Sequence, residues 1–205
     1  MAASCPTGFD IARLRKQVSQ TYDRLAREPN GDFHFHRGPE YASRMLGYNL
    51  DELTSIPAEC TASFSGLGNP HRIGPIEPGE TILDVGCGAG MDLLLAARRT
   101  GASGRAIGID PTPAMIEHAK CAALKTGVWQ NVTIRRGTAE ELSLQSGTID
   151  VVISNGMMNL SSDKRRMFSE IYRVLRPGGR LYLADVVVQR ELSLSARSDI
   201  NLWIA

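Results

Sequence analysis

Short apolar runs, each about the length of a strand, recur along the second half of the chain and alternate with segments whose apolar positions have helical spacing. The runs predict strands at 81–86, 105–109, 131–135, 149–154 and 180–188. The segments between them predict helices at 90–100, 113–126 and 163–175. Strands that alternate with helices form a parallel sheet with crossover helices, so the pattern predicts an α/β fold.

Residues that favour helix ends support these boundaries. Thr112 and Pro113 are typical of a helix start, and Gly127 lies just past the predicted end of the same helix. The segment Pro177-Gly178-Gly179 is expected to end the helix at 163–175.

The first third of the chain has a different pattern. Apolar residues spaced three or four positions apart predict an amphipathic helix at 11–25. Residues 32–75 are irregular and rich in aromatic side chains, apart from a short helix expected at 38–47. We therefore expect two parts, an N-terminal helical cap at 1–75 and a sheet core at 76–205.

Composition narrows the class of protein. Among 205 residues, 23 Lys and Arg balance 22 Asp and Glu, which gives a net charge of +1. Without a basic block, the charge pattern argues against a nucleic-acid or membrane partner, and the apolar runs are far shorter than the ~20 residues of a membrane span. Four scattered cysteines without a Cys-x-x-Cys pair predict free thiols and no metal site. With no secretory signal at the start, we expect a cytoplasmic protein.

A glycine-rich segment follows the first predicted strand. Gly86, Gly88 and Gly90 alternate just after Asp84, and Asp110 ends the second predicted strand twenty residues after Gly90. Such glycines allow a sharp turn and a close approach of the backbone to a ligand, and the later acid accepts hydrogen bonds from ribose hydroxyls. The arrangement predicts a nucleoside-binding site.

Two classes of nucleotide compete for this site. A dinucleotide site has the spacing Gly-x-Gly-x-x-Gly, and its backbone cradles a pyrophosphate. Here the spacing is Gly-x-Gly-x-Gly, and Asp84 beside the loop would repel a pyrophosphate. The same acid suits a ligand with a sulfonium and an α-amino group. We therefore predict S-adenosyl-L-methionine (SAM) as the cofactor.

Ligands of such sheets lie outside the carboxyl ends of the strands, so several strand ends contribute to the predicted site. The segment from Gly137 to Glu140 follows the third strand and is expected to contact an adenine edge. Met115 follows the second strand closely enough to touch the adenosine. The predicted cofactor-binding residues are Asp84, Gly86, Cys87, Gly88, Gly90, Asp110, Pro111, Met115, Thr138, Ala139, Glu140, Ser154 and Asn155.

These motifs, together with the Leu-Arg-Pro-Gly-Gly stretch at 175–179, resemble class I SAM-dependent methyltransferases over residues 76–188. The resemblance implies a Rossmann-like SAM-binding core at 76–205 and methyl transfer to a small molecule. It also implies two strands after the fifth, and only seventeen residues follow Val188, so we expect the C-terminal strands to be missing from a truncated chain. The strand at 180–188 would then be an exposed edge, which predicts a homodimer through its apolar end.

A narrower resemblance extends into both flanks. Segments 41–48, 66–70, 154–164 and 181–186 resemble the arsenite methyltransferase family, which methylates trivalent arsenic held by cysteine thiolates. Where that family has two of its cysteines, this chain has Leu67 and Gly156. The third family cysteine follows a Leu-Trp pair that corresponds to Leu202-Trp203, and the chain ends at Ala205.

The residues on the acceptor side are therefore predicted less sharply than those for the cofactor. The predicted acceptor-binding residues are Cys60, Asn155, Gly156, Asn159 and Asp185. We predict no catalytic acid–base pair, because a soft or ionised acceptor needs only proximity, orientation and exclusion of water by the cap. Three hypotheses stay open: a trivalent arsenical as acceptor, an organic carbon, nitrogen or oxygen acceptor, and a non-catalytic cofactor-binding fragment that another chain completes.

Overall fold

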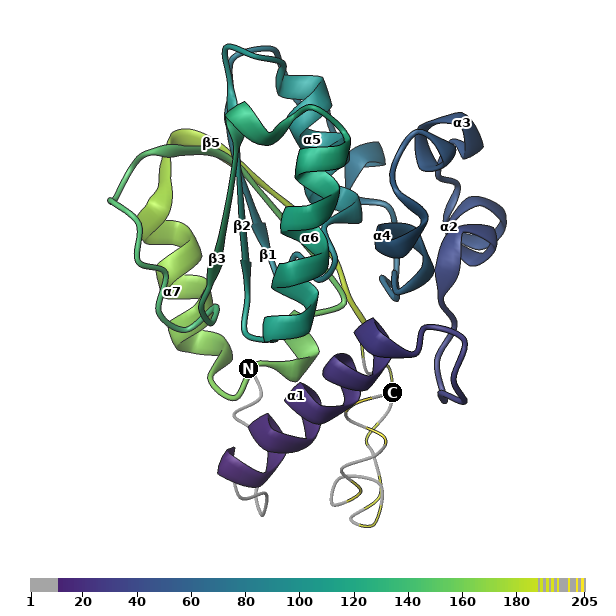
Figure 1. The fold of residues 1–205 in the computed structure, drawn as a ribbon. Coiled ribbons are helices and arrows are strands. Elements are labelled where there is room, and N and C mark those ends of the chain that lie inside the picture. Colours follow the sequence, from purple (N-terminus) through teal and green to yellow (C-terminus); the bar gives the residue numbers. More distant parts are fainter. Residues whose placement is uncertain are drawn as a thin grey trace.

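A parallel sheet forms the centre of the molecule (Figure 1). The computed structural model describes residues 11–187 and residues 189, 191, 193, 195, 199, 202 and 204. In this part of the chain the sheet has five strands in the order β3-β2-β1-β4-β5, and every neighbouring pair is parallel. The strands are β1 (Thr81–Val85), β2 (Arg105–Asp110), β3 (Val132–Arg136), β4 (Ile149–Asn155) and β5 (Leu175–Ala184). The predicted α/β fold is confirmed.

Helices cover both faces of the sheet. Helices α5 (Met91–Thr100) and α6 (Pro113–Lys125) pack on one face, and α7 (Lys164–Val174) packs on the other (Figure 1). Successive residues of a strand point to opposite faces. In β1, Ile82 accordingly packs with Ala96 of α5, whereas Leu83 packs in the cluster that contains Met167 of α7.

Strand β5 differs from its predicted boundaries. It begins at Leu175 directly after α7, so Pro177-Gly178-Gly179 lies inside the strand instead of ending a helix at residue 175. The pairing with β4 is irregular at this point, because Leu175 pairs with Ile149 but Arg180 already pairs with Val151. A proline is tolerated where a ladder is interrupted, since no hydrogen bond from its nitrogen is needed there.

The far end of β5 also differs from the prediction. The strand was expected to reach residue 188, but it ends at Ala184. The Asp185 carboxylate accepts hydrogen bonds from the backbone N–H groups of Val186 (2.7 Å) and Asn159 (3.1 Å), which fixes the chain in a non-strand conformation. β5 is an edge of the described sheet, as expected. The exposed Val186 and Val187 lie beyond the strand, and Val188 lies outside the described residues.

The cap contains more helix than predicted. Helices α1 (Ile11–Arg27) and α2 (Gly38–Leu46) lie close to the predicted positions. Helices α3 (Leu50–Thr54) and α4 (Ala58–Ala62) and the 3-10 turn η1 (Pro70–Arg72) form where irregular chain was expected. Two further 3-10 turns in the core are η2 (Trp129–Asn131) and η3 (Met158–Leu160). The start of α3 had a signal in the sequence, because Asn49 precedes the helix and its side chain accepts hydrogen bonds from the backbone N–H groups of Asp51 and Glu52.

The cap is continuous with the core. Leu53 and Cys60 of the cap belong to the same buried cluster as Leu93 of α5 and Ala119 of α6. Helix α1 lies across the end of the sheet at which β1 and β2 finish, as Figure 1 shows. This places cap residues over the carboxyl ends of the strands. No helix in the described part of the chain is long and apolar enough to cross a membrane.

Candidate active site

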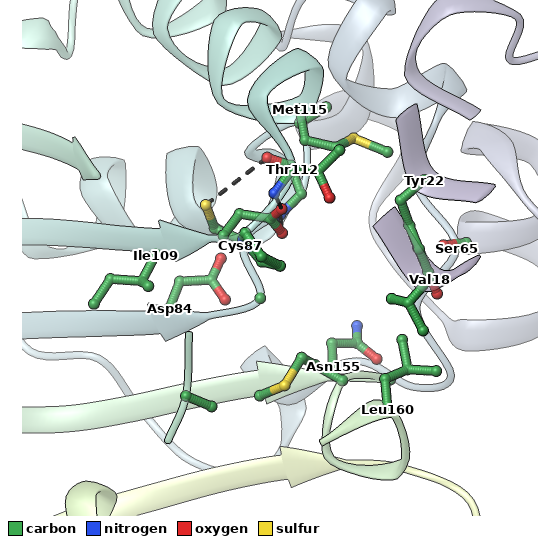
Figure 2. A pocket seen from close by; sticks show the side chains of 18 of the residues that line it. Val18, Tyr22, Ser65, Asp84, Cys87, Ile109, Thr112, Met115, Asn155 and Leu160 are labelled. Atoms are coloured by element: carbon green, nitrogen blue, oxygen red, sulfur yellow. Dashed lines mark hydrogen bonds between the residues drawn. The ribbon is translucent and has the colours of Figure 1, made fainter. Parts of the chain in front are cut away.

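A cavity of about 310 Å³ lies at the carboxyl ends of β1, β2 and β4, beneath the cap. Its walls come from α1, from the loop before η1, from the glycine loop after β1 and from the segments that follow β2, β3 and β4. Figure 2 shows the side chains of Asp84, Cys87 and Met115 facing those of Val18 and Tyr22 across this space. The volume is at the lower end of the range for small-molecule sites.

The glycine loop is held against the end of β2. The backbone N–H groups of Gly86 and Cys87 both donate to the Ile109 carbonyl, at 2.8 and 3.1 Å. Gly86 has a φ of +79°, and a Cβ at this position would come within 2.7 Å of the Met157 side chain. Only glycine combines this backbone conformation with this close contact, so the loop keeps its backbone at the cavity wall.

Asp110 fixes the next turn of the wall. One of its carboxylate oxygens accepts from the Gly88 N–H at 3.0 Å, and the other accepts from the Thr112 N–H at 2.8 Å. Burial raises the pKa of Asp110 above its ordinary value, and these two hydrogen bonds oppose the rise. The side chain thus ties the glycine loop to the start of α6. A carboxylate in this position is suited to accept hydrogen bonds from ribose hydroxyls.

Asp84 lies at the end of β1 and is buried. Its Oδ2 atom has no hydrogen-bond partner in the described structure. Burial raises the pKa of the Asp84 carboxyl well above its ordinary value, and the nearby charges of Asp92 and Asp110 raise it further. An acid in this state is costly without a positive partner, which fits a cationic ligand in the cavity.

The end of the cavity beyond β3 is polar. The Glu140 carboxylate accepts hydrogen bonds from the Ser161 hydroxyl (2.8 Å) and from the backbone N–H (3.0 Å) and hydroxyl (3.1 Å) of Ser162. Burial acts to raise the pKa of Glu140, but these hydrogen bonds together hold it below its ordinary value. Arg15 of α1 donates to the Ser162 hydroxyl at 2.9 Å, so the cap is fastened to this rim.

Helix α1 supplies a wall that the sequence did not reveal as part of a site. Val18, Ser19 and Tyr22 line the cavity from the cap side (Figure 2). Burial raises the pKa of Tyr22 to about 12, so its hydroxyl stays protonated at neutral pH. The apolar stripe that predicted α1 therefore serves partly to cover a ligand site.

A second polar cluster joins the cap to the core behind the cavity. The Asp92 carboxylate of α5 accepts from the Tyr48 hydroxyl at 2.6 Å and from the Asn155 side-chain amide at 3.0 Å. The His71 ring of η1 lies 3.2 Å from the same carboxylate and is itself buried. Burial raises the pKa of Tyr48 well above its ordinary value, and the charge of Asp92 adds to the rise, which keeps the phenol a hydrogen-bond donor.

Asn155 contributes its whole side-chain amide to this junction. Its Oδ1 accepts from the backbone N–H groups of Leu67 (2.7 Å) and Gly68 (3.1 Å). Its Nδ2 donates to the Gly68 carbonyl at 2.8 Å as well as to Asp92. The residue lines the cavity. Its polar atoms are used by α5 and by residues 63–69, the loop between α4 and η1 that we call the cap loop. Asn155 therefore positions these elements rather than offering free groups to a ligand.

The two positions at which the resemblance suggested cysteines do meet in space. A Cβ on Gly156 would lie 3.4 Å from the Leu67 side chain. The contact between the cap loop and the end of β4 therefore has an isobutyl group and a glycine in place of two thiols. Cys60 lines the cavity elsewhere, and its Sγ lies 2.6 Å from the Ala89 carbonyl.

Most of the predicted ligand-binding residues surround the cavity. Those that line it are Asp84, Gly86, Cys87, Gly88, Asp110, Pro111, Met115, Thr138, Ala139, Glu140 and Asn155, together with the acceptor candidates Cys60 and Gly156. The structure thus brings together side chains from four strand ends that the strand pattern had predicted to converge.

Four predicted site residues do not line the cavity. Gly90, with a φ of +94°, begins α5 and faces Ala119 of α6, which a Cβ would approach to 3.1 Å. Ser154 is buried in the sheet, where its hydroxyl donates to the Val85 carbonyl at 3.0 Å. Asn159 and Asp185 were expected to face the acceptor, but the Asp185 carboxylate is turned to the Asn159 backbone N–H. They connect the turn after β4 to the end of β5.

Sequence reasoning missed several residues of the site. These are Arg15, Val18, Ser19 and Tyr22 of α1, residues 63–66 of the cap loop, Asp92, and the segment 160–162. Asp92 had a recognisable signal, since it lies between Met91 and Leu93 in a helix that is otherwise buried. No group of three or more His, Cys, Asp or Glu side chains within the described ranges is placed to hold a metal ion.

The Rossmann-like sheet, the glycine loop and the acids after β1 and β2 define a class I SAM-dependent methyltransferase, whose cofactor is SAM. Residues 76–203 match the family described as "Methyltransferase domain", and the chain belongs to this family.

Its relatives include arsenite methyltransferases. The chain is 43% identical over 145 residues to an arsenite methyltransferase of Halobacterium salinarum, which covers 71% of this chain and 37% of that protein. A solved structure of an arsenic(III) S-adenosylmethionine methyltransferase from Chlamydomonas reinhardtii is 39% identical, with a TM-score of 0.67 over 72% of this chain and 52% of that one. A demethylmenaquinone methyltransferase of Symbiobacterium thermophilum is 37% identical over 103 residues, which are 50% of this chain and 41% of that protein. The chain thus spans about half the length of these relatives, or less.

Proposed function

We propose that this chain transfers the methyl group of SAM to a small organic molecule that carries a carbon, nitrogen or oxygen nucleophile. The observation that carries the choice of acceptor is the contact between Leu67 and Gly156. These two residues stand at the positions where the resemblance to arsenite methyltransferases would put two cysteines, and neither carries a thiol.

The residues of the cavity fit the cofactor. Asp110 and the glycine loop suit a nucleoside, and the unpaired oxygen of Asp84 suits a positive group. When bound, SAM supplies a methyl group on a positively charged sulfur, which is open to in-line attack by a nucleophile. The contribution of the chain is to hold the two reactants at a productive distance, while α1 and the cap loop exclude water.

Arsenic(III) is a poor fit to the thiols that remain in the cavity. It is a soft ion that prefers thiolates over neutral thiols. Burial raises the pKa of Cys60 to about 12, and burial also raises the pKa of Cys87 well above its ordinary value. Both side chains therefore remain protonated at neutral pH. By contrast, Phe64, Met157 and Leu160 give the cavity apolar walls for a carbon framework.

An arsenical acceptor is the second candidate, because two of the relatives described above methylate arsenic. In this case the thiol ligands of arsenic would come from the acceptor itself rather than from the chain.

A homodimer through the β5 edge also stays a proposal, and sedimentation at high protein concentration tests it. A clean monomer there would argue against it.

The cofactor part of the proposal is tested by calorimetry with SAM on the folded chain. Saturable binding at one site supports it, and the absence of binding contradicts it. Methyl transfer is then followed with labelled SAM against a panel of phenols, quinols and amines. Tight cofactor binding without transfer to any acceptor would favour the non-catalytic fragment instead.

We expect arsenite, supplied with an excess of a small thiol, to be turned over no faster by the wild type than by a Cys60→Ser variant. Serine preserves a donor to the Ala89 carbonyl but cannot ligate arsenic as a thiolate does. The measurement is the rate of appearance of methylated arsenic. A tenfold or greater loss of rate in Cys60→Ser would show that the chain ligates arsenic and would overturn the choice of an organic acceptor. Rapid turnover in both proteins would support the second candidate.

A further inference from the structure

Three carboxyl groups from three different elements border the same cavity. Asp84 is the last residue but one of β1, Asp92 lies in the first turn of α5, and Asp110 is the last residue of β2. Their exposed fractions are 2%, 6% and 7%, so all three are nearly removed from water. Buried like charges destabilise one another. A cluster of three buried carboxyl groups is therefore stabilised either by a proton on one of them or by a bound cation.

The three acids differ in how their charge is compensated. Asp110 accepts two backbone N–H groups, one on each oxygen. Asp92 accepts from Tyr48 and Asn155 and faces the ring of His71. Asp84 receives a backbone hydrogen bond from Leu93, but its Oδ2 is buried without any partner in the described structure. Figure 2 shows this carboxyl group directed into the cavity. Of the three acids, Asp84 is thus the one with a carboxylate oxygen that no hydrogen-bond donor compensates in the described structure.

The charged and titratable groups around Asp84 do not supply the missing cation. The neighbours that act on it are Asp92 and Asp110, with the thiol of Cys87 in the glycine loop and the phenol of Tyr48 in the cap. Two arginines line the cavity, but both are bonded at its rim. Arg15 donates to the Ser162 hydroxyl, and Arg136 donates to the Pro111 carbonyl at 3.2 Å. His71 faces Asp92 rather than Asp84.

We propose that Asp84 holds a proton in the cofactor-free protein and loses it when SAM binds, so that this residue selects the cationic cofactor over its uncharged-sulfur product. The inference rests on the proposed function in requiring that SAM bind in this cavity. Its geometric basis is the unpartnered Oδ2 at the cavity wall, and the raised pKa of the Asp84 carboxyl agrees with it.

The proton balance of the cycle is closed. On binding, the Asp84 carboxyl releases one proton to solvent, and the resulting carboxylate is neutralised by the sulfonium. During transfer the bond between sulfur and methyl breaks, and the sulfur keeps the electron pair as a neutral thioether. The methyl forms a bond to the acceptor, and the proton of an acceptor that carries one on its nucleophilic atom is released to solvent. The Asp84 carboxylate has then lost its counter-ion, and it takes up one proton from water as S-adenosylhomocysteine leaves. Product release is favoured by this uptake.

Because SAM binding is coupled to proton release from Asp84, the direction in which SAM affinity changes with pH follows. Below the pKa of Asp84 in the free protein, SAM must displace a proton, so its affinity rises by up to about tenfold per pH unit as the pH increases. S-adenosylhomocysteine lacks the sulfonium but keeps the α-amino group, so its affinity rises less steeply over the same range. The ratio of the two affinities therefore increases with pH until Asp84 is ionised in the free protein.

The test is calorimetric titration of both ligands at pH 7 in buffers that differ in ionisation enthalpy, which counts the protons released. We expect a net release of protons when SAM binds and a clearly smaller release when S-adenosylhomocysteine binds. In Asp84→Asn the release should disappear, and the preference for SAM should fall at least tenfold and become independent of pH. Asp51→Asn, which removes an exposed acid outside the cavity, should behave as the wild type.

The outcomes separate this inference from the proposed function. SAM binding without proton release, or a release that persists in Asp84→Asn, overturns the inference and leaves cofactor binding intact. Failure of the wild type to bind either ligand contradicts the proposed function and this inference with it. If Asp84→Asn does not fold, the pH dependence of the two affinities in the wild type decides, and parallel curves for the two ligands overturn the inference.

Discussion

Replacing Asp110 with alanine is expected to weaken SAM binding by roughly 100-fold or more, which corresponds to about 3 kcal/mol. The substitution removes the acceptor for the Gly88 and Thr112 N–H groups and leaves both donors unsatisfied at the cavity wall. It also removes the carboxylate suited to the ribose hydroxyls. Calorimetry gives the affinity, and circular dichroism with thermal melting shows whether the fold persists.

Asp110→Asn is the matched comparison for this prediction. The amide retains one oxygen acceptor, so one of the two backbone hydrogen bonds survives, and we expect a loss of roughly tenfold, about 1.4 kcal/mol. A graded series, with alanine weaker than asparagine and asparagine weaker than wild type, is the expected pattern. If Asp110→Ala bound SAM within threefold of the wild type while remaining folded, the assignment of this cavity to the cofactor would be wrong.

The sheet and its cofactor side follow from local patterns in the sequence. Each strand of a parallel sheet is a short apolar run, and the residues just after such runs meet at one edge of the sheet. Asp84, the glycine loop, Asp110 and Glu140 are therefore found from the spacing of the apolar runs and of the glycines, and all of them except Gly90 line the cavity. Gly90 shows the limit of this reasoning, because a glycine within the motif packs against Ala119 instead of the ligand.

The cap side depends on contacts between residues far apart in the chain. Tyr48, Gly68, Asp92 and Asn155 form one hydrogen-bonded group although up to 107 positions separate them. No periodicity connects such residues, and each has an ordinary local role in a loop or helix. The boundaries of β5 were missed for a related reason, since the register shift near Ile149 is a property of the pair of strands.

The contact between Leu67 and Gly156 could be predicted only in part from the sequence. The resemblance named both positions, but the sequence alone could not show that they touch. Because they do, the two substitutions act on one place in the structure rather than on two. That place is also where Asn155 binds the backbone of the cap loop. The end of the cavity next to β4 is therefore shaped by how firmly this loop is held.

We expect Asn155→Ala to lower the free energy of unfolding by about 2–4 kcal/mol and to reduce methyl transfer more strongly than cofactor binding. The variant leaves the N–H groups of Leu67 and Gly68 without their acceptor, and it removes one donor from the buried Asp92 carboxylate. Asp92 keeps the Tyr48 hydroxyl and the His71 ring but loses part of its compensation, which is costly for a buried carboxylate. The cap loop also loses its fixed position over the end of β4. The cavity-lining residues Asp84 and Asp110, at the ends of β1 and β2, are not hydrogen-bonded to Asn155.

Chemical denaturation gives the change in stability, and hydrogen exchange at the Leu67 and Gly68 amides reports directly on the loop. Protection at these two amides should fall, while protection in β1 should fall only by the global loss of stability. Asn155→Asp is the sharper companion, because it keeps an acceptor for the loop but places a carboxylate beside Asp92, so we expect it to be at least as destabilised. Asn30→Ala, in an exposed turn, should stay within about 0.5 kcal/mol of the wild type. Unchanged protection of Leu67 and Gly68 in Asn155→Ala would show that other contacts hold the cap loop and that Asn155 is not its anchor.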